Sequence, residues 1–274
     1  MTQPTDSTYL LGETRAEHER LIRQGHIFAP FTERLFRDAG IETGQRVLDV
    51  GSGVGDVALL AARLVGPSGE VIGVERDPST VATASSRASA AGLANVRFMQ
   101  GEVGSVTIAE PFDAIVGRLI IEFVPDADAV MRSITSLLRP GGVVAFQDAC
   151  WGTWLDLNKG LPLRGKCVSL IHEAFASSGA HMDMERILFR AIHEAGLPTP
   201  AMRIEVPIGD DPNIVRYAHD LFSTLLPRMR EHGLSLTEIG DLETLDSRLE
   251  AERLAAQTFA STQALVSAWS RKSV

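Results

Sequence analysis

Short apolar runs alternate with longer stretches of helical character from Arg46 to Gln147. The runs, read in order, are Val47–Val50, Glu70–Val74, Asn95–Met99, Phe112–Val116 and Gly142–Phe146. They are largely apolar on both faces, which is typical of strands covered by helices on both sides of a sheet. We therefore expect these five runs to form a parallel sheet.

The stretches between the runs carry signals for helix ends. Asp77 places a capping carboxylate before Pro78 at the first helical position, and Gly92 closes that helix. Asp126 is expected to cap the next helix, which the Pro140 turn follows. Strands that alternate with helices in this way imply right-handed crossovers, so the predicted fold class is α/β with a doubly wound sheet.

The regular alternation ends after Asp148. Residues 150–183 and 209–262 have a helical pattern and are expected to form a cap over one edge of the sheet. Residues 184–208 and 263–274 are expected to complete the sheet. The predicted elements there are the helix Met184–Ala195 and the strands Met202–Pro207 and Gln263–Ser270.

A glycine-rich turn follows the first predicted strand. Gly51, Gly53 and Gly55 lie between that strand and the helix Val57–Leu64. Glycine permits positive φ and lets a ligand approach the backbone, and a helix N-terminus offers unpaired N–H groups. This arrangement predicts a nucleotide cofactor at the carboxyl end of the first strand.

Two nucleotide cofactors compete for this turn. A dinucleotide site prefers G-x-G-x-x-G, but Asp56 stands where the third glycine would be. Asp49 inside the strand is unfavourable beside a pyrophosphate and suits a ligand that carries an ammonium and a sulfonium. Charge complementarity therefore favours S-adenosyl-L-methionine, and an NAD(P)-dependent oxidoreductase is the alternative.

Two further acids follow the next strands. Glu75 lies 24 residues after Gly51, where a carboxylate can accept hydrogen bonds from ribose hydroxyls. Glu102 follows the third strand, in a position that suits an acceptor for the adenine amino group, with the Val103 N–H facing a ring nitrogen.

Five motifs thus follow one another: Asp49–Gly55, Glu75, Glu102, Phe112–Arg118 and Leu138–Gly142. In this order they resemble the motifs of class I S-adenosylmethionine-dependent methyltransferases. The most similar group is the ubiquinone/menaquinone C-methyltransferase-like enzymes that act on small molecules. The resemblance covers residues 40–150 strongly and Ala264–Arg271 more weakly.

The resemblance implies a seven-stranded Rossmann-like sheet in the order 3-2-1-4-5-7-6, with strand 7 antiparallel. It makes residues 41–149 the cofactor-binding core and residues 1–40 a helical lid, with Tyr9 and Gln24 as candidate lid contacts. The expected cofactor contacts are Asp49, Gly51, Ser52 and Gly53 at the methionyl part, Glu75 at the ribose, Arg76, Glu102 and Val103 at the adenine, and Arg118 or Gly117 beside the acceptor pocket.

The acceptor side is less determined. Gly117–Ile120 replaces the (Asp/Asn/Ser)-Pro-Pro-(Tyr/Phe) box of amide- and base-directed N-methyltransferases, which argues against nucleic-acid amino groups and glutamine side chains as acceptors. Trp151 and Trp154 are candidates for an apolar wall. His181 and Asp148 are candidate bases, and no catalytic residue is assigned.

The amino-acid composition argues against several classes of binding partner. A net charge of −9 argues against nucleic acid as the main partner. Cys150 and Cys167, the only cysteines, form no C-x-x-C, and no histidine pair has metal-ligand spacing, so neither a disulfide nor a metal site is expected. No stretch has the length of a signal peptide core or a membrane span, which favours a cytoplasmic protein without a membrane partner.

The predicted function is methyl transfer to an oxygen, nitrogen or carbon atom of a small, partly apolar molecule. A second alternative, besides the oxidoreductase, is a protein that binds S-adenosylmethionine without transferring its methyl group. Association into a homo-oligomer is left open.

Overall fold

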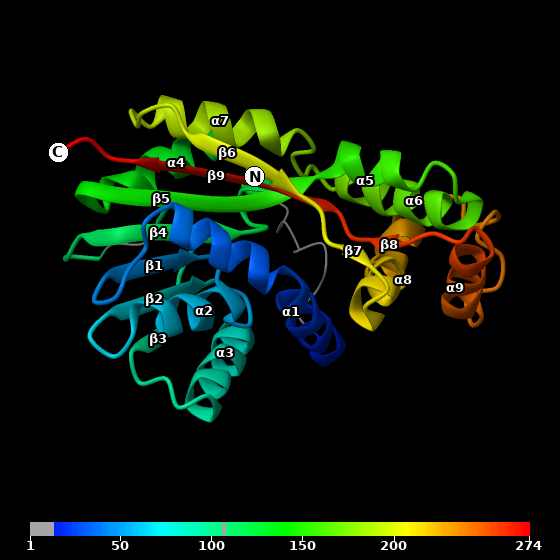
Figure 1. The fold of residues 1–274 in the computed structure, drawn as a ribbon, viewed down its shortest axis with the longest axis horizontal. Helices are drawn as coiled ribbons and strands as arrows, with labels where there is room; N and C mark the ends of the chain where they lie inside the picture. The colour runs from blue at the N-terminus through cyan, green and yellow to red at the C-terminus, as the bar shows by residue number, and fades with distance from the viewer. Residues whose placement is uncertain (1–13, 106–107) are drawn as a thin grey trace, which may run out of the picture.

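The computed structural model describes residues 14–105 and 108–274. In this part of the chain seven strands form one sheet in the order β3-β2-β1-β4-β5-β9-β6 (Figure 1). The strands are β1 Arg46–Val50, β2 Glu70–Glu75, β3 Val96–Gln100, β4 Phe112–Arg118, β5 Leu138–Cys150, β6 Ala201–Glu205 and β9 Ala264–Arg271. β9 is antiparallel to both β5 and β6. The predicted strand order and the antiparallel seventh strand are confirmed.

Helices cover both faces of this sheet. On one face lie α1 (Arg15–Asp38), α2 (Asp56–Val65) and α3 (Pro78–Ala90), and on the other lie α4 (Ala127–Ser136) and α7 (Met184–Glu194) (Figure 1). Alternate residues of the central strands supply the two apolar layers: Val47 faces α2 whereas Leu48 packs with α4 and α7. The central strands are therefore buried on both faces, as their apolar runs indicate, whereas the edge strands β3 and β6 are only partly buried.

The predicted helix starts match the observed caps. The Asp77 side chain accepts a hydrogen bond from the Thr80 N–H at the start of α3. The Asp126 side chain accepts one from the Ala129 N–H at the start of α4. These bonds satisfy N–H groups that have no partner inside the helix.

β5 is longer than the sequence pattern predicts. The run Gly142–Phe146 suggests a short strand, whereas β5 extends from Leu138 to Cys150. Its second half pairs with β9 in a ladder that ends at Cys150 opposite Ala264. This long-range partner stabilises extended backbone well past Phe146 and carries the chain beyond the edge of the neighbouring strands.

A second group of helices lies beyond the carboxyl ends of the parallel strands, at the right of Figure 1. They are α5 (Trp151–Leu157), α6 (Pro162–Ser177), α8 (Pro212–Glu231) and α9 (Leu245–Ala255). Two short strands, β7 (Ile208–Gly209) and β8 (Ala260–Ser261), pair beside them. These elements share an apolar core of their own, to which Phe28 of α1 contributes. We refer to α5, α6, α8 and α9 as the cap helices.

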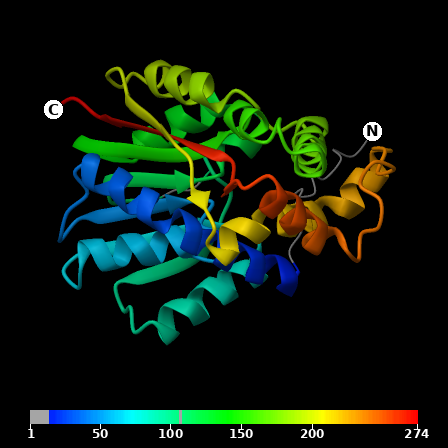
Figure 2. The ribbon, with the colours of Figure 1, turned by 45° about the vertical axis from the view of Figure 1, so that its right-hand side comes forward.

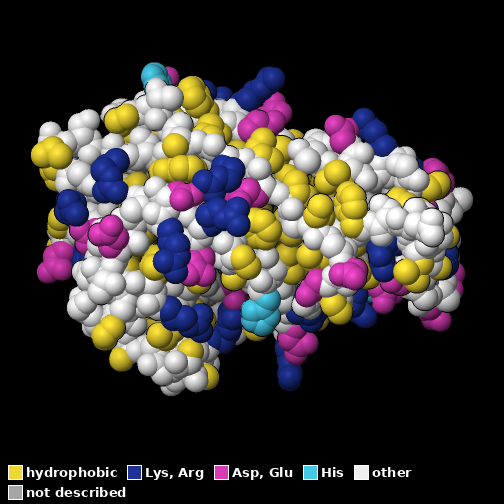
Figure 3. Space-filling view, viewed as in Figure 1, with side chains coloured by type: hydrophobic (Ala, Val, Ile, Leu, Met, Phe, Trp, Pro, Cys, Tyr) yellow, Lys and Arg dark blue, Asp and Glu magenta, His cyan; other side chains and the backbone are white. Residues whose placement is uncertain are grey.

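α1 joins the two parts. It packs against α2 on the sheet side and against α8 on the cap side (Figure 2). On the face shown in Figure 3, Lys and Arg side chains are interspersed with Asp and Glu. Within the described residues, no helix combines the length and apolar character needed to cross a membrane.

Candidate functional site

The glycine turn connects β1 to α2 with left-handed backbone. Gly51, Gly53 and Gly55 have φ of 65°, 51° and 90°. A Cβ on Gly51 would overlap the Ile120 side chain, whereas a Cβ on Gly53 would meet no atom of the described residues within 4 Å. Gly51 is thus required by packing, and Gly53 borders open space.

Glu75 ends β2 directly beside this turn. Its Oε2 accepts a hydrogen bond from the Gly53 N–H at 3.0 Å, and its Oε1 accepts one from the Asp77 N–H at 3.1 Å. Two backbone donors thus fix the carboxylate. Glu75 reaches the turn because β1 and β2 are adjacent parallel strands whose last register pair is Val50 with Val74. Such a carboxylate keeps free lone pairs for the hydroxyls of a ligand.

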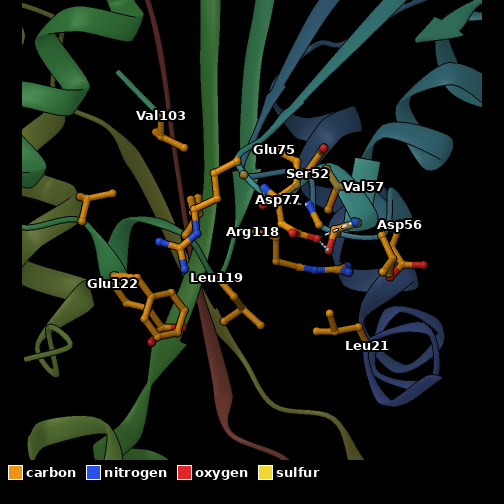
Figure 4. A pocket seen from close by; sticks show the side chains of 18 of the residues that line it. Leu21, Ser52, Asp56, Val57, Glu75, Asp77, Val103, Arg118, Leu119 and Glu122 are labelled. Atoms are coloured by element: carbon orange, nitrogen blue, oxygen red, sulfur yellow. Dashed lines mark hydrogen bonds between the residues drawn. The ribbon is translucent and has the colours of Figure 1, made fainter. Parts of the chain in front are cut away.

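A cavity of about 380 Å³ begins at this turn and continues to the cap helices (Figure 4). The strand ends contribute polar lining: Gly51, Ser52, Gly53, Glu75, Arg76, Asp77, Glu102, Val103 and Arg118. The segment after β4 and the cap helices contribute mainly apolar lining: Leu119, Ile120, Glu122, Phe123, Trp151, Phe175, Tyr217 and Leu221. One continuous cavity therefore has a polar part and an aromatic part.

The structure brings eight of the nine predicted cofactor contacts to this cavity, and Asp49 is the exception. Asp49 is 1% exposed on β1, and neither of its carboxylate oxygens has a hydrogen-bond partner among the described residues. Burial raises its pKa to about 8, although the positive charge of Arg118 acts in the opposite direction. Asp49 thus lies behind the turn, and its contact with a cofactor stays a prediction.

Arg118 separates the two parts of the cavity lining. Its guanidinium donates to Thr32 Oγ1 at 3.0 Å and lies 5.7 Å from the centre of the Phe28 ring. Burial lowers the pKa of Arg118, and the charges of Asp56 and Asp49 oppose that effect. Asp56, which occupies the third glycine position, also forms an ion pair with Arg87 at 2.6 Å.

Glu122 lines the aromatic part and is a residue that the sequence analysis missed. It lies in the 3₁₀ turn Ile121–Phe123 and is 2% exposed. Within the part of the chain that the structure describes, its Oε2 has no hydrogen-bond partner. Burial raises its pKa well above the usual range, and the neighbouring carboxylate of Asp148 adds to this. The available signal was a single acid inside the apolar run from Leu119 to Val124.

The two predicted bases lie outside the cavity lining. Asp148 is completely buried, and its Oδ1 accepts from the N–H groups of Ile120 at 2.9 Å and Glu122 at 3.3 Å. The His181 ring is 2.9 Å from the Val124 carbonyl oxygen through Nε2. The structure therefore places Glu122, rather than either of these residues, on the cavity surface.

Of the residues predicted for the apolar wall and the lid, some line the cavity and others do not. Trp151 lines the cavity and its ring centroid lies 4.7 Å from that of Phe175. Trp154 does not line it, and its indole N–H donates to the Ser261 carbonyl oxygen at 3.1 Å. Gln24 lines the cavity and accepts from the Tyr217 hydroxyl at 3.0 Å. Tyr9 lies outside the described residues.

Comparison with known proteins gives one family. A family model described as "Methyltransferase domain" matches residues 41–187. An arsenite methyltransferase of Halobacterium salinarum is 36% identical over 111 residues, which cover 40% of this chain and 28% of that protein. A ubiquinone/menaquinone biosynthesis C-methyltransferase of Pseudomonas putida is 28% identical over 163 residues, which cover 54% of this chain and 64% of that protein.

A solved structure extends the similarity to the whole fold. Phosphoethanolamine N-methyltransferase 2 of Haemonchus contortus, in complex with phosphomonomethylethanolamine and S-adenosylhomocysteine, matches with a TM-score of 0.60 and 16% identity. The match covers all of this chain and 62% of that one. The chain thus matches less than two thirds of the length of each of these relatives.

Proposed function

The chain belongs to the methyltransferase-domain family, and we propose that it transfers the methyl group of S-adenosyl-L-methionine to a small, partly apolar molecule. The named relatives support a small acceptor, since one is an arsenite methyltransferase and the other a ubiquinone/menaquinone biosynthesis C-methyltransferase. The methylated atom is oxygen, nitrogen or carbon.

The position of Glu75 carries this proposal. Its carboxylate is held by the N–H groups of Gly53 and Asp77 and faces the cavity, as a ribose ligand must. The absence of a Cβ on Gly53 leaves room for a ligand at the turn. The lining acids Glu75 and Glu102 favour a ligand with positive charge. The residues present therefore fit S-adenosylmethionine.

We assign the parts of this cofactor to the polar lining. Gly51, Ser52 and Gly53 would hold the methionyl part, Glu75 the ribose, and Arg76, Glu102 and Val103 the adenine. When bound, S-adenosylmethionine supplies a methyl group on a positively charged sulfur.

The residues of this chain then act mainly by orientation. The glycine turn would fix S-adenosylmethionine. The aromatic wall, which includes Trp151 and Phe175, would confine the methyl acceptor. Alignment of reacting groups is worth roughly 7–11 kcal/mol of the barrier. A general base adds about 10²–10⁴-fold in rate, roughly 3–5 kcal/mol. The shape of the cavity is therefore the larger contribution.

The residue at the start of α2 argues against the NAD(P) alternative. Asp56 begins α2 where a dinucleotide site needs glycine, and its carboxylate is held there by Arg87. A side chain at this position prevents the close helix–strand packing that the third glycine permits in a dinucleotide site. The alternative of cofactor binding without methyl transfer predicts no product that is heavier by one methylene group.

Glu75→Ala tests the assignment of the cofactor. Losing hydrogen bonds to a charged acceptor, at about 1.5–3 kcal/mol, should weaken the binding of S-adenosylhomocysteine roughly 10- to 150-fold in isothermal titration. Glu70→Ala is the matched control, because Glu70 begins the same strand and pairs with Arg46 away from the cavity. An unchanged dissociation constant would remove Glu75 from the ribose, and binding of NAD(P) alone would overturn the proposed function.

Self-association and location also remain proposals. We propose that a second copy of the chain would pack near the connection from β6 to β7, where Ile204 and Ile208 are each about half exposed. Analytical ultracentrifugation tests the homo-oligomer, and cell fractionation tests a cytoplasmic location.

A further inference from the structure

The segment after β4 holds Glu122 in a fixed position. Leu119 adopts a positive φ of 55°, and its N–H donates to the Gln147 carbonyl oxygen at 2.7 Å. A residue with a Cβ persists in this conformation only where its surroundings determine it. Here Asp148 Oδ1 accepts from the N–H groups of Ile120 and Glu122 and thereby fixes the turn.

This turn lies directly against the glycine turn. The Ile120 side chain occupies the place that a Cβ on Gly51 would need. Glu122, two residues later, lines the same cavity as Gly51 and Gly53. The Glu122 carboxyl therefore belongs to the part of the cavity that follows the proposed methionyl position, where Figure 4 places it across Arg118 from Glu75.

Glu122 and Asp148 form a buried pair of acids. Oε2 of Glu122 and Oδ2 of Asp148 are buried without hydrogen-bond partners among residues 14–105 and 108–274. The Tyr217 hydroxyl on α8 and the Trp151 indole N–H on α5 lie close enough to Glu122 to influence its charge. Arg118, at the end of β4, lines the same cavity. His181 contacts Glu122 through its backbone N–H, and its ring bonds the Val124 carbonyl oxygen instead.

Two adjacent buried carboxylates do not both ionise readily, because each disfavours the charge of the other. Asp148 has its charge partly stabilised by two backbone N–H groups. The proton of the pair therefore resides on Glu122 when the cavity holds no cation. Burial and the Asp148 charge both raise the pKa of Glu122 in this way.

Resting on the proposed function, we propose that Glu122 accepts the proton which the methyl acceptor loses, and that this acceptor reacts through an O–H or N–H group. The acceptor oxygen or nitrogen forms a bond to the methyl carbon. The carbon–sulfur bond breaks and leaves its electron pair on sulfur. The O–H or N–H proton moves to the Glu122 carboxylate, so that atoms and electrons balance.

This assignment keeps the buried site electrically neutral. Before transfer a sulfonium cation faces an ionised Glu122, and afterwards a neutral sulfide faces a protonated Glu122. Uncompensated charge in a buried site is costly, so neutrality on both sides of the reaction favours transfer. Asp148 acts as a positioning residue, because it holds the turn and does not reach the cavity surface.

The pairing of charges predicts a proton release that needs no methyl acceptor to measure. Binding of cationic S-adenosylmethionine should expel the proton from Glu122, whereas binding of neutral S-adenosylhomocysteine should leave it in place. Isothermal titration in buffers of different ionisation enthalpy counts these protons. We expect S-adenosylmethionine to release up to about one proton more per site than S-adenosylhomocysteine.

The difference should depend on pH in a bell-shaped manner. It disappears at high pH, where Glu122 is ionised with either ligand, and at low pH, where it stays protonated with both. In Glu122→Gln the difference should vanish at every pH. Glu173→Gln, an exposed acid on α6 outside the cavity lining, is the matched control and should keep it. Asp148→Asn should move the bell to lower pH, because it removes the neighbouring negative charge.

The wild-type titration can overturn the inference by itself, even if a variant fails to fold. A folded Glu122→Gln variant then assigns the proton to Glu122 rather than to Asp49, whose pKa is also raised by burial. Equal proton release with both ligands would overturn the role of Glu122 and leave the proposed function intact. Failure of both ligands to bind would overturn the proposed function and this inference with it. A difference that persists in a folded Glu122→Gln variant would assign the proton to another group.

Discussion

At the scale of single residues, two glycines of one turn have opposite surroundings. Gly51 and Gly53 both have positive φ, which costs a residue with a Cβ about 1–2 kcal/mol. Gly51 is additionally pressed against Ile120, whereas Gly53 borders open space in the cavity. A substitution at Gly53 therefore tests the binding of the cofactor without disturbing the packing against Ile120.

Gly53→Ala should lose affinity with only a modest loss of stability. Its new methyl group points into the space assigned to the cofactor, so we expect S-adenosylhomocysteine to bind at least about tenfold more weakly, or 1.4 kcal/mol. Gly92→Ala is the control, because Gly92 also has positive φ and open surroundings but lies outside the cavity lining. Calorimetric melting should show similar losses for both variants, and equal affinities would contradict the cofactor position.

Asp49 should make the free energy of unfolding depend on pH. Its pKa of about 8 in the folded protein lies above the usual 3.8, so the folded state keeps a proton that the unfolded state loses. Its contribution is therefore fully present below pH 4 and is lost as pH rises towards 8, at about 1.4 kcal/mol per unit. Asp49→Asn should flatten this slope in urea unfolding between pH 5 and 8. Asp126→Asn, at an exposed acid, is the control and should leave the slope unchanged. An unchanged slope in Asp49→Asn would show that Asp49 is ionised in the folded protein.

The sequence predicts the polar lining better than the acceptor side for a physical reason. Glu75 and Glu102 follow strands directly, and parallel strands bring their carboxyl ends to one edge of a sheet. Glu122 depends on contacts made across long separations, since Trp151 and Tyr217 bury it from α5 and α8. Asp148 looked like a base because local sequence does not reveal that two backbone N–H groups already bind it.

At the scale of elements, α1 depends on one glycine for its position. Gly25 is buried against the start of α2, where a Cβ would lie 2.7 Å from both carboxylate oxygens of Asp56. Arg87 holds that carboxylate in place. The close approach lets α1 carry Gln24 to the cavity and Arg118 reach Thr32.

Gly25→Ala tests this packing by the sign of its effect. In a helix without neighbours, alanine is more stable than glycine by about 0.5–1 kcal/mol. Against Asp56, overpacking should instead destabilise the protein by about 1–3 kcal/mol and weaken cofactor binding. Gly152→Ala in α5, where a Cβ meets nothing within 4 Å, is the control and should not destabilise the protein. Stabilisation of Gly25→Ala in urea unfolding would contradict the position of α1.

The elements differ in how far local patterns predict them. The ends of α3 and α4 follow from Asp77 and Asp126, whose caps act within a few residues. The length of β5 does not follow from local residues. The last residues of β5 are extended because they pair with β9, which lies more than a hundred positions later in the chain. Local periodicity cannot reveal such a partner.

At the scale of the whole molecule, buried polar bonds tie the cap helices to the return of the chain into the sheet. The Ser261 carbonyl oxygen accepts from the Trp154 indole and from the Arg164 guanidinium, both at 3.1 Å. Ser261 precedes β9 by only three residues, and β5 continues directly into α5. These bonds hold the residues just before β9 on the cap. Separating the cap from the sheet would also break the bond from the Tyr217 hydroxyl of α8 to Gln24 of α1, and a buried polar group left unpaired costs about 1–3 kcal/mol.

We therefore expect the cap and the sheet to unfold together. Trp269→Phe removes the tryptophan of β9 and leaves Trp151 and Trp154 of α5 as fluorescent reporters. In this variant, fluorescence follows the cap and far-ultraviolet circular dichroism follows the whole chain, and the two urea transitions should coincide. The cavity draws its lining from both the cap and the sheet. S-adenosylhomocysteine at 100 times its dissociation constant should therefore raise the free energy of unfolding measured by each probe by about 2.7 kcal/mol. If the fluorescence transition came first and ignored the ligand, the cap would be an independent unit, and an aromatic wall built from it could not orient an acceptor against the cofactor.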